Sequence, residues 1–293
     1  MNVLVTGGTG FIGQAVVRHA LHDGARVAVL TRSPDTKVVP QGVRVIGGGL
    51  VSPDWRTIEE FHPDFCVHCA WVATPGTYLA SPENAVLADL SHSLADGLYA
   101  RGLKKFVGLG TCFEYEASRE PLDETAVLSI ASLPYVQAKL RVLKSLQSCF
   151  ENRHAWMRVF YAYGPGEHPK RLTSLAIRTL SHGGILHLHN PDDIVDYIHV
   201  EDIASAILVV CHSAACGIFN IGSGQGRPVR AVASLIARLC GHPEGVTWEN
   251  PEGFQSRVAD SGRLRALGWA PRCDFEDSIK AMCLAEATSR GAS

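Results

Sequence analysis

The stretch VLVTGGTGFIG, residues 3–13, places Gly7, Gly10 and Gly13 between a short apolar run and a segment with helical periodicity. The run predicts a buried strand and the segment an amphipathic helix, so the glycines fall in the turn between them. In such a turn Gly7 permits the tight bend, Gly10 lets a pyrophosphate approach the backbone, and Gly13 lets the helix pack closely on the strand. The helix N-terminus adds free N–H groups and a positive dipole. A glycine-rich turn without a ligand is the alternative, but the strand–turn–helix setting favours dinucleotide binding.

The first 160 residues alternate short apolar runs with helical patterns, which is typical of a parallel sheet with crossover helices. We expect strands at 3–6, 26–30, 44–46, 65–69, 105–109 and 155–160, and helices at 11–22, 83–101 and 135–150. The last three strands are apolar at nearly every residue, as expected of strands covered on both faces. The sequence therefore predicts an α/β protein of the Rossmann type, with a doubly wound parallel sheet.

After YGPGEHP, residues 163–169, proline and glycine become frequent and the pattern changes. Helices are expected at 172–182, 200–212 and 229–240, with loops between them. We divide the chain into a Rossmann domain at 1–164 and a smaller C-terminal lobe at 165–293. The apolar run at 217–224 is a strand that can rejoin the main sheet.

Composition excludes several classes of partner. The net charge of −2 over 293 residues gives no basis for binding nucleic acid or an anionic membrane. No apolar run approaches the roughly 20 residues of a membrane-spanning helix, and MNVLVT leaves no room for a signal sequence, so we expect a cytoplasmic protein. Nine scattered cysteines indicate reduced thiols. Cys66 and Cys69 have the spacing of a metal pair, but on a strand they face opposite ways and no second pair follows, so we expect no metal.

The end of the second strand bears on the choice of dinucleotide. Sites for NAD usually carry an acidic residue about 20 residues after the glycines, which binds the ribose 2′-hydroxyl. Here the strand ends in Thr31, Arg32 and Ser33, without a carboxylate. An arginine at this point suits a 2′-phosphate. NADP(H) is therefore favoured and NAD(H) remains possible, the alternative being that Arg32 is an ordinary solvated loop residue.

A candidate acid–base group follows in SLPYVQAKLRVLKSL, residues 132–146, where Tyr135 and Lys139 share one helix face. A free tyrosine has a pKa of about 10, and a nearby ammonium lowers that pKa by stabilising the phenolate. Thr111 ends a buried strand at the sheet edge where ligands bind, so its hydroxyl can orient a substrate oxygen. Each residue alone has a purely structural explanation. With the glycine turn, the three predict a catalytic site.

These motifs occur in a fixed order, and together they resemble a known family. The order is TGGTGFIG at 6–13, VHCA at 67–70, Thr111, the Tyr-x-x-x-Lys pair, YGPG at 163–166, DYIHVEDIASAI at 196–207, GIFNIGSG at 217–224 and LGWAP at 267–271. Over nearly its whole length the chain resembles the extended short-chain dehydrogenase/reductases, in their NAD-dependent epimerase/dehydratase branch. The resemblance implies a nucleotide-sugar substrate, a C-terminal lobe that binds it, and a homodimer formed through helices 83–101 and 135–150.

The resemblance also implies roles for individual residues. Thr111, Tyr135 and Lys139 become the catalytic residues, with the 161–163 segment near the nicotinamide. Cofactor contacts are implied for Gly7, Gly10, Phe11, Ile12, Gly13, Thr31, Arg32, Leu50, Ala70, Tyr135, Lys139 and Phe160. Substrate contacts are implied for Cys112, Phe113, Arg171 and Arg257, the arginines being suited to a diphosphate.

The sequence also departs from the family. Gly48-Gly49-Leu50 stands where many relatives have Gly-Asp-Leu, and helix 83–101 lacks a clear counterpart of an asparagine often found there. The acidic positions 192, 193 and 196–202 are expected to be structural, as helix caps and a solvated turn.

The residues after Thr111 narrow the reaction. Sugar 4,6-dehydratases of the family have Asp-Glu there, whereas this chain has Cys112 and Phe113, neither of which suits proton transfer. Glu114 is expected to point the other way if the loop is extended. Two reactions remain: reduction of a 4-keto-6-deoxy nucleotide sugar by NADPH, and 4-epimerisation with tightly held NAD. Arg32 favours the reductase. A non-catalytic NADP-binding sensor or scaffold is the alternative of another class, and the presence of both Tyr135 and Lys139 speaks against it.

Overall fold

The computed structural model describes residues 1–33, 39–129, 133–249 and 253–291. The strands are β1 (Asn2–Thr6), β2 (Arg26–Leu30), β3 (Arg44–Ile46), β4 (Phe65–His68), β5 (Lys105–Thr111), β6 (His154–Val159), β7 (Tyr161–Tyr163), β8 (Leu186–Leu188), β9 (Ile194–His199), β10 (Gly217–Ile221), β11 (Gly226–Pro228), β12 (Val246–Trp248) and β13 (Ser256–Arg257). The helices are α1 (Phe11–His22), α2 (Trp55–Phe61), α3 (Glu83–Ala100), α4 (Pro134–Phe150), α5 (Leu172–Ser181), α6 (Val200–His212), α7 (Val229–Leu239), α8 (Gly262–Arg265) and α9 (Phe275–Gly291), with 3₁₀ turns at Cys112–Glu114 and Glu151–Arg153.

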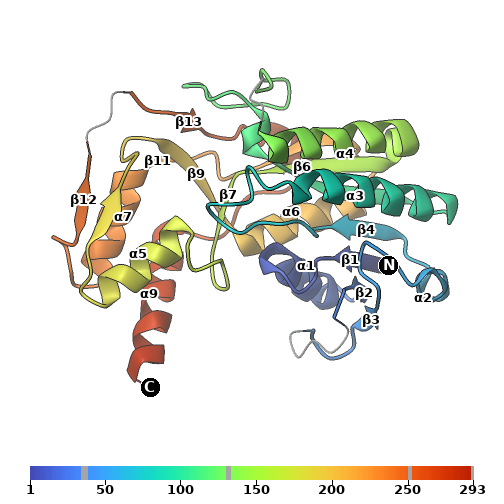
Figure 1. Cartoon of the computed structure of the whole chain (residues 1–293), viewed down its shortest axis with the longest axis horizontal. Helices are drawn as coiled ribbons and strands as arrows, with labels where there is room; N and C mark the ends of the chain where they lie inside the picture. Colours follow the sequence, from blue (N-terminus) through green and yellow to red (C-terminus); the bar gives the residue numbers. More distant parts are fainter. Residues whose placement is uncertain (34–38, 130–132, 250–252, 292–293) are drawn as a thin grey trace.

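The main sheet has seven parallel strands in the order β10-β6-β5-β4-β1-β2-β3 (Figure 1). This is the doubly wound Rossmann-type arrangement that the sequence predicts. β10 lies at one edge and pairs with β6, so the chain returns to this sheet after building part of the smaller lobe. The order of the strands reverses at β1 and β4, and ligands of such sheets bind beyond the carboxyl ends of the strands at that point.

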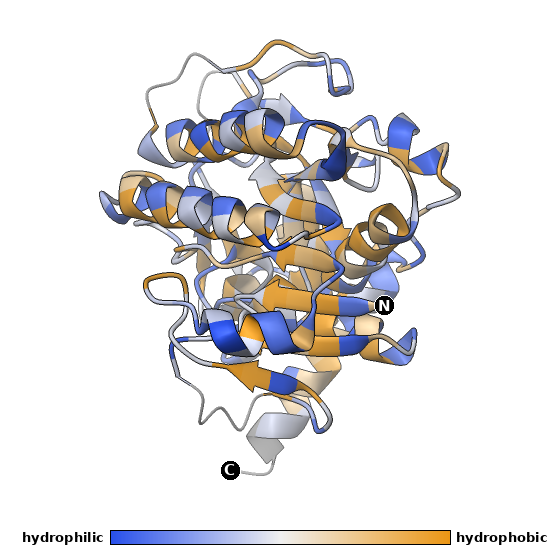
Figure 2. Cartoon of the chain, turned by 90° about the vertical axis from the view of Figure 1, so that its right-hand side faces the viewer, coloured by the Kyte–Doolittle hydropathy of each residue, from blue (hydrophilic) through white to orange (hydrophobic). Residues whose placement is uncertain are grey.

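Both faces of the sheet are covered. Helices α1 and α6 pack on one face, and α2, α3 and α4 on the other. Along β1 the side chains alternate between the two faces. Val3 and Val5 belong to the hydrophobic core on the α1 and α6 side, and Leu4 belongs to the core on the α2, α3 and α4 side. Figure 2 shows the strands as mainly hydrophobic, between helices that alternate hydrophilic and hydrophobic residues. Burial on both faces explains why these strands have no polar alternation in the sequence.

The smaller lobe has its own core. Two small sheets, β11-β9-β13 with β7 alongside β9, and β12-β8, pack with α5, α7 and α9. The last described helix, α9, projects from the bottom of this lobe in Figure 1. Among the described residues no helix is both long and apolar enough to cross a lipid bilayer.

One structural expectation from the sequence is wrong in part. Positions 196 and 202 were expected in a solvated turn, yet both carboxylates are buried. Asp196 accepts the backbone N–H of Ala259 at 3.0 Å, and Asp202 accepts that of Arg272 at 2.8 Å. They hold the C-terminal segment onto β9 and α6, because a buried carboxylate needs N–H donors in place of water. This long-range pairing has no signal in local sequence.

Candidate active site

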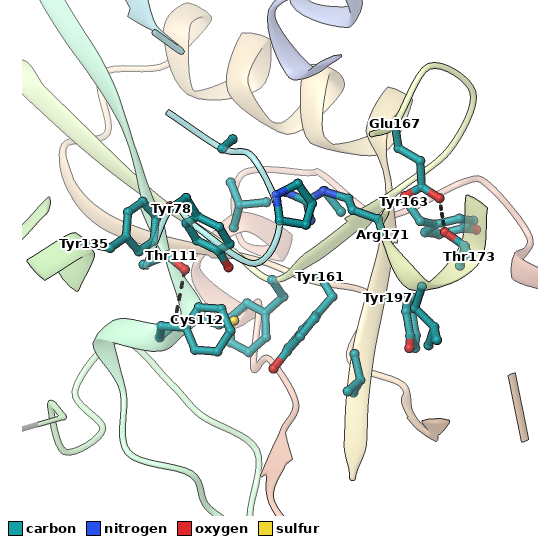
Figure 3. A pocket seen from close by; sticks show the side chains of 18 of the residues that line it. Tyr78, Thr111, Cys112, Tyr135, Tyr161, Tyr163, Glu167, Arg171, Thr173 and Tyr197 are labelled. Carbon is teal, nitrogen blue, oxygen red and sulfur yellow. Dashed lines mark hydrogen bonds between the residues drawn. The ribbon is translucent and has the colours of Figure 1, made fainter. Parts of the chain in front are cut away.

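A cavity of about 530 Å³ lies between the carboxyl edge of the main sheet and the smaller lobe (Figure 3). Its wall includes eight of the residues predicted for the site: Ile12, Thr111, Cys112, Phe113, Tyr135, Lys139, Phe160 and Arg171. Strand β5 and its 3₁₀ turn supply Thr111 to Phe113, and helix α4 supplies the Tyr–Lys pair. Residues far apart in the sequence therefore meet at one place.

The start of α4 fixes the tyrosine. Pro134 occupies the first helical position, where its missing N–H leaves no bond unmade. The backbone N–H of Tyr135, which has no partner within its own helix, donates to the carbonyl of Leu79 at 3.1 Å. Burial raises the pKa of the Tyr135 phenol, and hydrogen bonding with Thr111 only partly offsets this. The lowering of this pKa that was expected from Lys139 is therefore not observed, because burial outweighs it, and the phenol carries its proton at neutral pH.

Lys139 lies one helical turn further on, with 4% of its surface exposed. Its Nζ donates to the carbonyl of Leu109 at 2.8 Å and lies 3.8 Å from the centroid of the Trp71 ring. The distance from Nζ to the centroid of the Tyr135 ring is 5.7 Å. Burial lowers the pKa of Lys139 to about 7, against the opposing charge of Glu114. The side chain of Lys139 can thus change between ammonium and neutral amine near neutral pH.

Trp71 is held in place from α3. Its indole N–H donates to Asn84 Oδ1 at 2.8 Å, and the amide of Asn84 donates to the carbonyls of Tyr78 and Ser81. Sequence reasoning missed both Trp71 and Asn84. The tryptophan directly follows the VHCA motif, but nothing local indicates that its ring lies against the lysine of a distant helix.

Glu114 stands outside the cavity, although the stretch that carries it is a 3₁₀ turn and not the extended loop we expected. Its side chain is fully buried and accepts hydrogen bonds from the backbone N–H of Thr111 at 2.9 Å and from Arg158 Nε at 2.6 Å. The carboxylate therefore orients the end of β5 and is not available to a substrate.

Cys112 does line the cavity, but as a neutral thiol. Burial raises its pKa to about 12, and the nearby Arg257 only partly opposes this. Phe113 beside it carries no titratable group. The two positions next to Thr111 therefore offer no acid–base pair.

The glycine turn fits a phosphate group. Gly7 adopts a φ of +64°, and a Cβ on Gly13 would lie 2.1 Å from the Gly7 carbonyl oxygen. A Cβ on Gly7 would lie 2.7 Å from the backbone nitrogen of Ala70. The segments that follow β1 and β4 therefore approach too closely for a side chain at Gly7. Gly10 is the N-cap of α1 and gives it no side-chain cap. The turn thus has the compact shape and the open helix end that a pyrophosphate requires.

The remaining predicted residues lie around the cavity or apart from it. Arg257 is not in the cavity wall. Its guanidinium carbon lies 5.3 Å from the ring centroid of Phe113, a residue that does line the cavity. Leu50 lines a separate pocket with Trp55, beside α3. Arg32 is exposed, and its side chain lies over Gly49. The other predicted cofactor contacts, at Gly7, Gly10, Phe11, Gly13, Thr31 and Ala70, belong to the turn or to the adjoining strand ends.

Two histidines at the lobe side of the cavity were also missed. His187 and His189 lie on or next to β8, with ring centroids 5.3 Å apart, and Glu249, directly after β12, lies 3.3 Å from His187 Nε2. Within the described part of the chain, these three exposed side chains are the group whose ligand atoms are close enough to hold a metal ion. The predicted strand cysteines, Cys66 and Cys69, are free thiols outside that group.

A parallel sheet with a glycine turn after its first strand, and a Tyr–Lys pair at its carboxyl edge, defines the Rossmann-type short-chain dehydrogenase/reductase class. The model of the NAD dependent epimerase/dehydratase family matches residues 3–222, and the chain belongs to this family.

Relatives of known name extend along the whole chain. GDP-L-fucose synthase 1 of Arabidopsis thaliana is 24% identical, over 94% of this chain and 90% of its own length. A UDP-glucose 4-epimerase of Halalkalibacterium halodurans is 27% identical, over 93% and 91%. Among solved structures, the Thermus thermophilus UDP-glucose 4-epimerase in complex with NAD superposes with a TM-score of 0.82 at 27% identity, covering 96% of this chain and 97% of its own. The Thermotoga maritima UDP-glucose 4-epimerase with UDP-glucose reaches 0.85 at 23% identity, covering 99% of both, and shows the shared fold.

Proposed function

We propose that this chain reduces a 4-keto-6-deoxy nucleotide sugar with NADPH, adding a hydride to C4 and a proton from Tyr135 to the oxygen. The observation that carries the choice of reductase is the end of β2, where Arg32 stands between Thr31 and Ser33 and none of these three residues is a carboxylate. A reductase uses up its cofactor and must exchange it, whereas an epimerase returns the hydride and keeps NAD. A site suited to a 2′-phosphate therefore favours net reduction.

The surroundings of Arg32 support this choice. A Cβ at position 49 would lie 2.5 Å from Arg32 Cγ. Gly49, which stands where the family has an aspartate, therefore leaves room for the Arg32 side chain. An aspartate there would also put a negative charge beside the 2′-phosphate. The missing aspartate and the presence of Arg32 therefore both favour binding of a 2′-phosphate.

The proton chemistry follows from the cavity wall. When bound, the reduced nicotinamide supplies the hydride. Tyr135 is protonated in the unliganded chain, which is the form needed to donate to a developing alkoxide. Thr111 hydrogen-bonds the same oxygen and holds it against the phenol. Lys139, with a pKa near neutrality, stabilises the phenolate that remains and can return a proton to it.

A 4-epimerase that holds NAD is the second candidate, because UDP-glucose 4-epimerases are among the relatives. Dehydration is disfavoured, since Cys112 and Phe113 offer no acid–base pair and Glu114 is bound to Arg158. The two candidates differ in stoichiometry: only the reductase consumes one NADPH for each sugar.

The test is to incubate the purified protein with NADPH or NADH and a panel of 4-keto-6-deoxy nucleotide sugars, following the absorbance of the reduced cofactor. We expect consumption of NADPH, and little with Tyr135→Phe although that variant still binds the cofactor. Interconversion of C4 epimers without consumption would support the epimerase instead. Cofactor binding with no turnover of any sugar, unchanged in Tyr135→Phe, would support the sensor or scaffold.

Arg32→Ala tests the cofactor assignment separately. A charge-assisted hydrogen bond contributes about 1.5–3 kcal/mol, so this variant should bind NADPH about 10- to 100-fold more weakly and NADH about as before. Arg56→Ala, at an arginine that is 89% exposed and lies away from the glycine turn, is the matched control. Equal weakening for both cofactors would contradict the 2′-phosphate role.

We also propose a homodimer through α3 and α4. The two helices pack together, and their outer faces expose Asp89, His92 and Arg141 to solvent. Asp89 forms an ion pair with Arg141 there. Light scattering of wild type against Arg141→Glu tests it, since reversing the charge of an exposed side chain on this face would weaken a contact between two copies. A monomer in the wild type would contradict the proposal.

A further inference from the structure

Glu167 is a half-satisfied carboxylate in the cavity wall. It lies in the YGPGEHP turn after β7, 7% exposed. Its Oε1 accepts hydrogen bonds from the backbone N–H of Ser174, at 2.7 Å, and from the hydroxyl of Thr173. Its Oε2 has no hydrogen-bond partner among the residues that the structure describes.

The first oxygen is explained by helix α5. The N-cap of α5, Arg171, provides no side-chain cap, and Glu167 instead bonds the N–H of Ser174 in the first turn. A carboxylate at a helix N-terminus is favourable because of the free N–H groups and the dipole. The second oxygen is not explained in this way, and leaving a buried acceptor unpaired costs about 1–3 kcal/mol. A donor from a bound molecule would remove that cost.

The position of Glu167 indicates which part of a substrate could supply the donor. In Figure 3, Thr111 and Tyr135 lie at one end of the cavity, Arg171 reaches toward the middle, and Glu167 and Thr173 lie at the other end. A nucleotide sugar has the order sugar, diphosphate, nucleoside. With the sugar at Tyr135 and the diphosphate at Arg171, the nucleoside reaches Glu167.

We propose that Glu167 Oε2 accepts a hydrogen bond from the nucleobase, so that the chain selects nucleotide sugars whose base presents an exocyclic amine, such as cytosine or guanine, over those of uracil or thymine. The inference rests on the proposed function, because it takes the order of the substrate from the catalytic end. It goes beyond that function by assigning the base.

The chemistry of the acceptor gives the selectivity. An ionised carboxylate oxygen can only accept hydrogen bonds. Cytosine presents its N4 amine, and guanine its N1–H and N2 amine, to such an acceptor. Uracil and thymine present a single N–H between two carbonyl oxygens, which the carboxylate repels. A matched base contact of this kind contributes about 1–3 kcal/mol, or about a 5- to 100-fold preference.

The turn also fixes what a glutamine would do at this position. In Glu167→Gln the carbonyl oxygen must stay with the N–H of Ser174 and the Thr173 hydroxyl, so the amide NH₂ takes the place of Oε2. The free group changes from an acceptor to a donor, which suits the O4 of uracil. The substitution should therefore reverse the preference and leave the helix cap intact.

The experiment is calorimetric titration of the protein with two matched pairs of nucleoside diphosphates, above neutral pH so that Glu167 is ionised. CDP and UDP differ in the amine at C4, and GDP and IDP differ in the amine at C2. We expect the amine-bearing member of at least one pair to bind about 5- to 100-fold more tightly to the wild type. In Glu167→Gln, the pair that shows this advantage should lose it, and between CDP and UDP the preference should reverse.

Asp193→Asn is the matched control, because Asp193 also lines the cavity but its Oδ1 already accepts the N–H of Gln255 at 2.8 Å. It removes the same charge and should leave the base preference unchanged. Equal binding within both pairs, or a preference that Glu167→Gln does not change, would overturn the assignment of the base while leaving nucleotide binding intact. Failure of all four diphosphates to bind would overturn the nucleotide-sugar proposal itself, and the base assignment with it.

Discussion

Replacing Trp71 tests how the cavity keeps Lys139 charged. The ammonium is buried, donates to Leu109, and lies 3.8 Å from the centroid of the indole ring. Asn84 holds the ring from the side through the indole N–H. A cation over an aromatic face is stabilised by the ring's quadrupole, and Lys139 has little water to take over that role. Trp71→Leu removes the aromatic face and keeps an apolar side chain.

The size of the effect follows from the contact. A desolvated cation–π interaction is worth about 2 kcal/mol, and 1.36 kcal/mol corresponds to one pKa unit, so the pKa of Lys139 should fall by about 1 to 1.5 units. The sign is set by which form loses stabilisation. The charged form loses it, so a pKa that burial has already lowered to about 7 falls further, and less ammonium is present at neutral pH. Turnover that needs the ammonium should then decline at lower pH than in the wild type.

The assay is the pH dependence of NADPH turnover for wild type, Trp71→Leu and Trp71→Phe. The high-pH limb should move down by about one unit in the leucine variant. Phenylalanine keeps an aromatic face without the indole N–H, so its limb should stay close to that of the wild type. If the two variants shift equally, or if neither shifts, the ring does not stabilise the ammonium, and its role is packing alone.

Two further changes test the glycine turn and the buried ion pair. Gly13→Ala should abolish cofactor binding, measured by the fluorescence of NADPH, because the new Cβ would lie 2.1 Å from the Gly7 carbonyl oxygen. Gly47→Ala is the control and should bind NADPH normally, because its Cβ would meet open space. If Gly13→Ala kept its affinity for NADPH, the close packing at this glycine would be contradicted. Arg158→Met leaves the fully buried Glu114 without its cation and should lower the free energy of unfolding by about 3–5 kcal/mol. The melting temperature should then fall by about 10 °C. An unchanged melting temperature would show that the fold does not depend on the Arg158–Glu114 ion pair.

The sequence determined the fold class because its signals are local. Strands buried on both faces appear as apolar runs, and the glycines between β1 and α1 stand where backbone atoms approach too closely for a side chain. Tyr135 and Lys139 share a helix face by their spacing alone, so the catalytic pair and its place on α4 could be predicted. The family followed from the order of such motifs.

Other parts of the site depend on contacts between distant segments, which no local pattern reports. The sequence predicts a solvated turn around Asp196 and Asp202, because a carboxylate looks the same in sequence whether water or backbone N–H groups surround it. In the same way Glu114 is turned from the cavity by Arg158, which lies on another strand.

The strands of the sheet, the glycine turn and the Tyr–Lys pair could all be predicted from the sequence, since each arises from residues within a few positions of one another. The contact of the Trp71 ring with Lys139, and the Glu167 oxygen that lacks a hydrogen-bond partner among the described residues, depend on how distant segments pack. The physical reason is that charge stabilisation and hydrogen bonding act over a few ångströms in space, whereas the partners lie tens of residues apart along the chain or are supplied by a ligand.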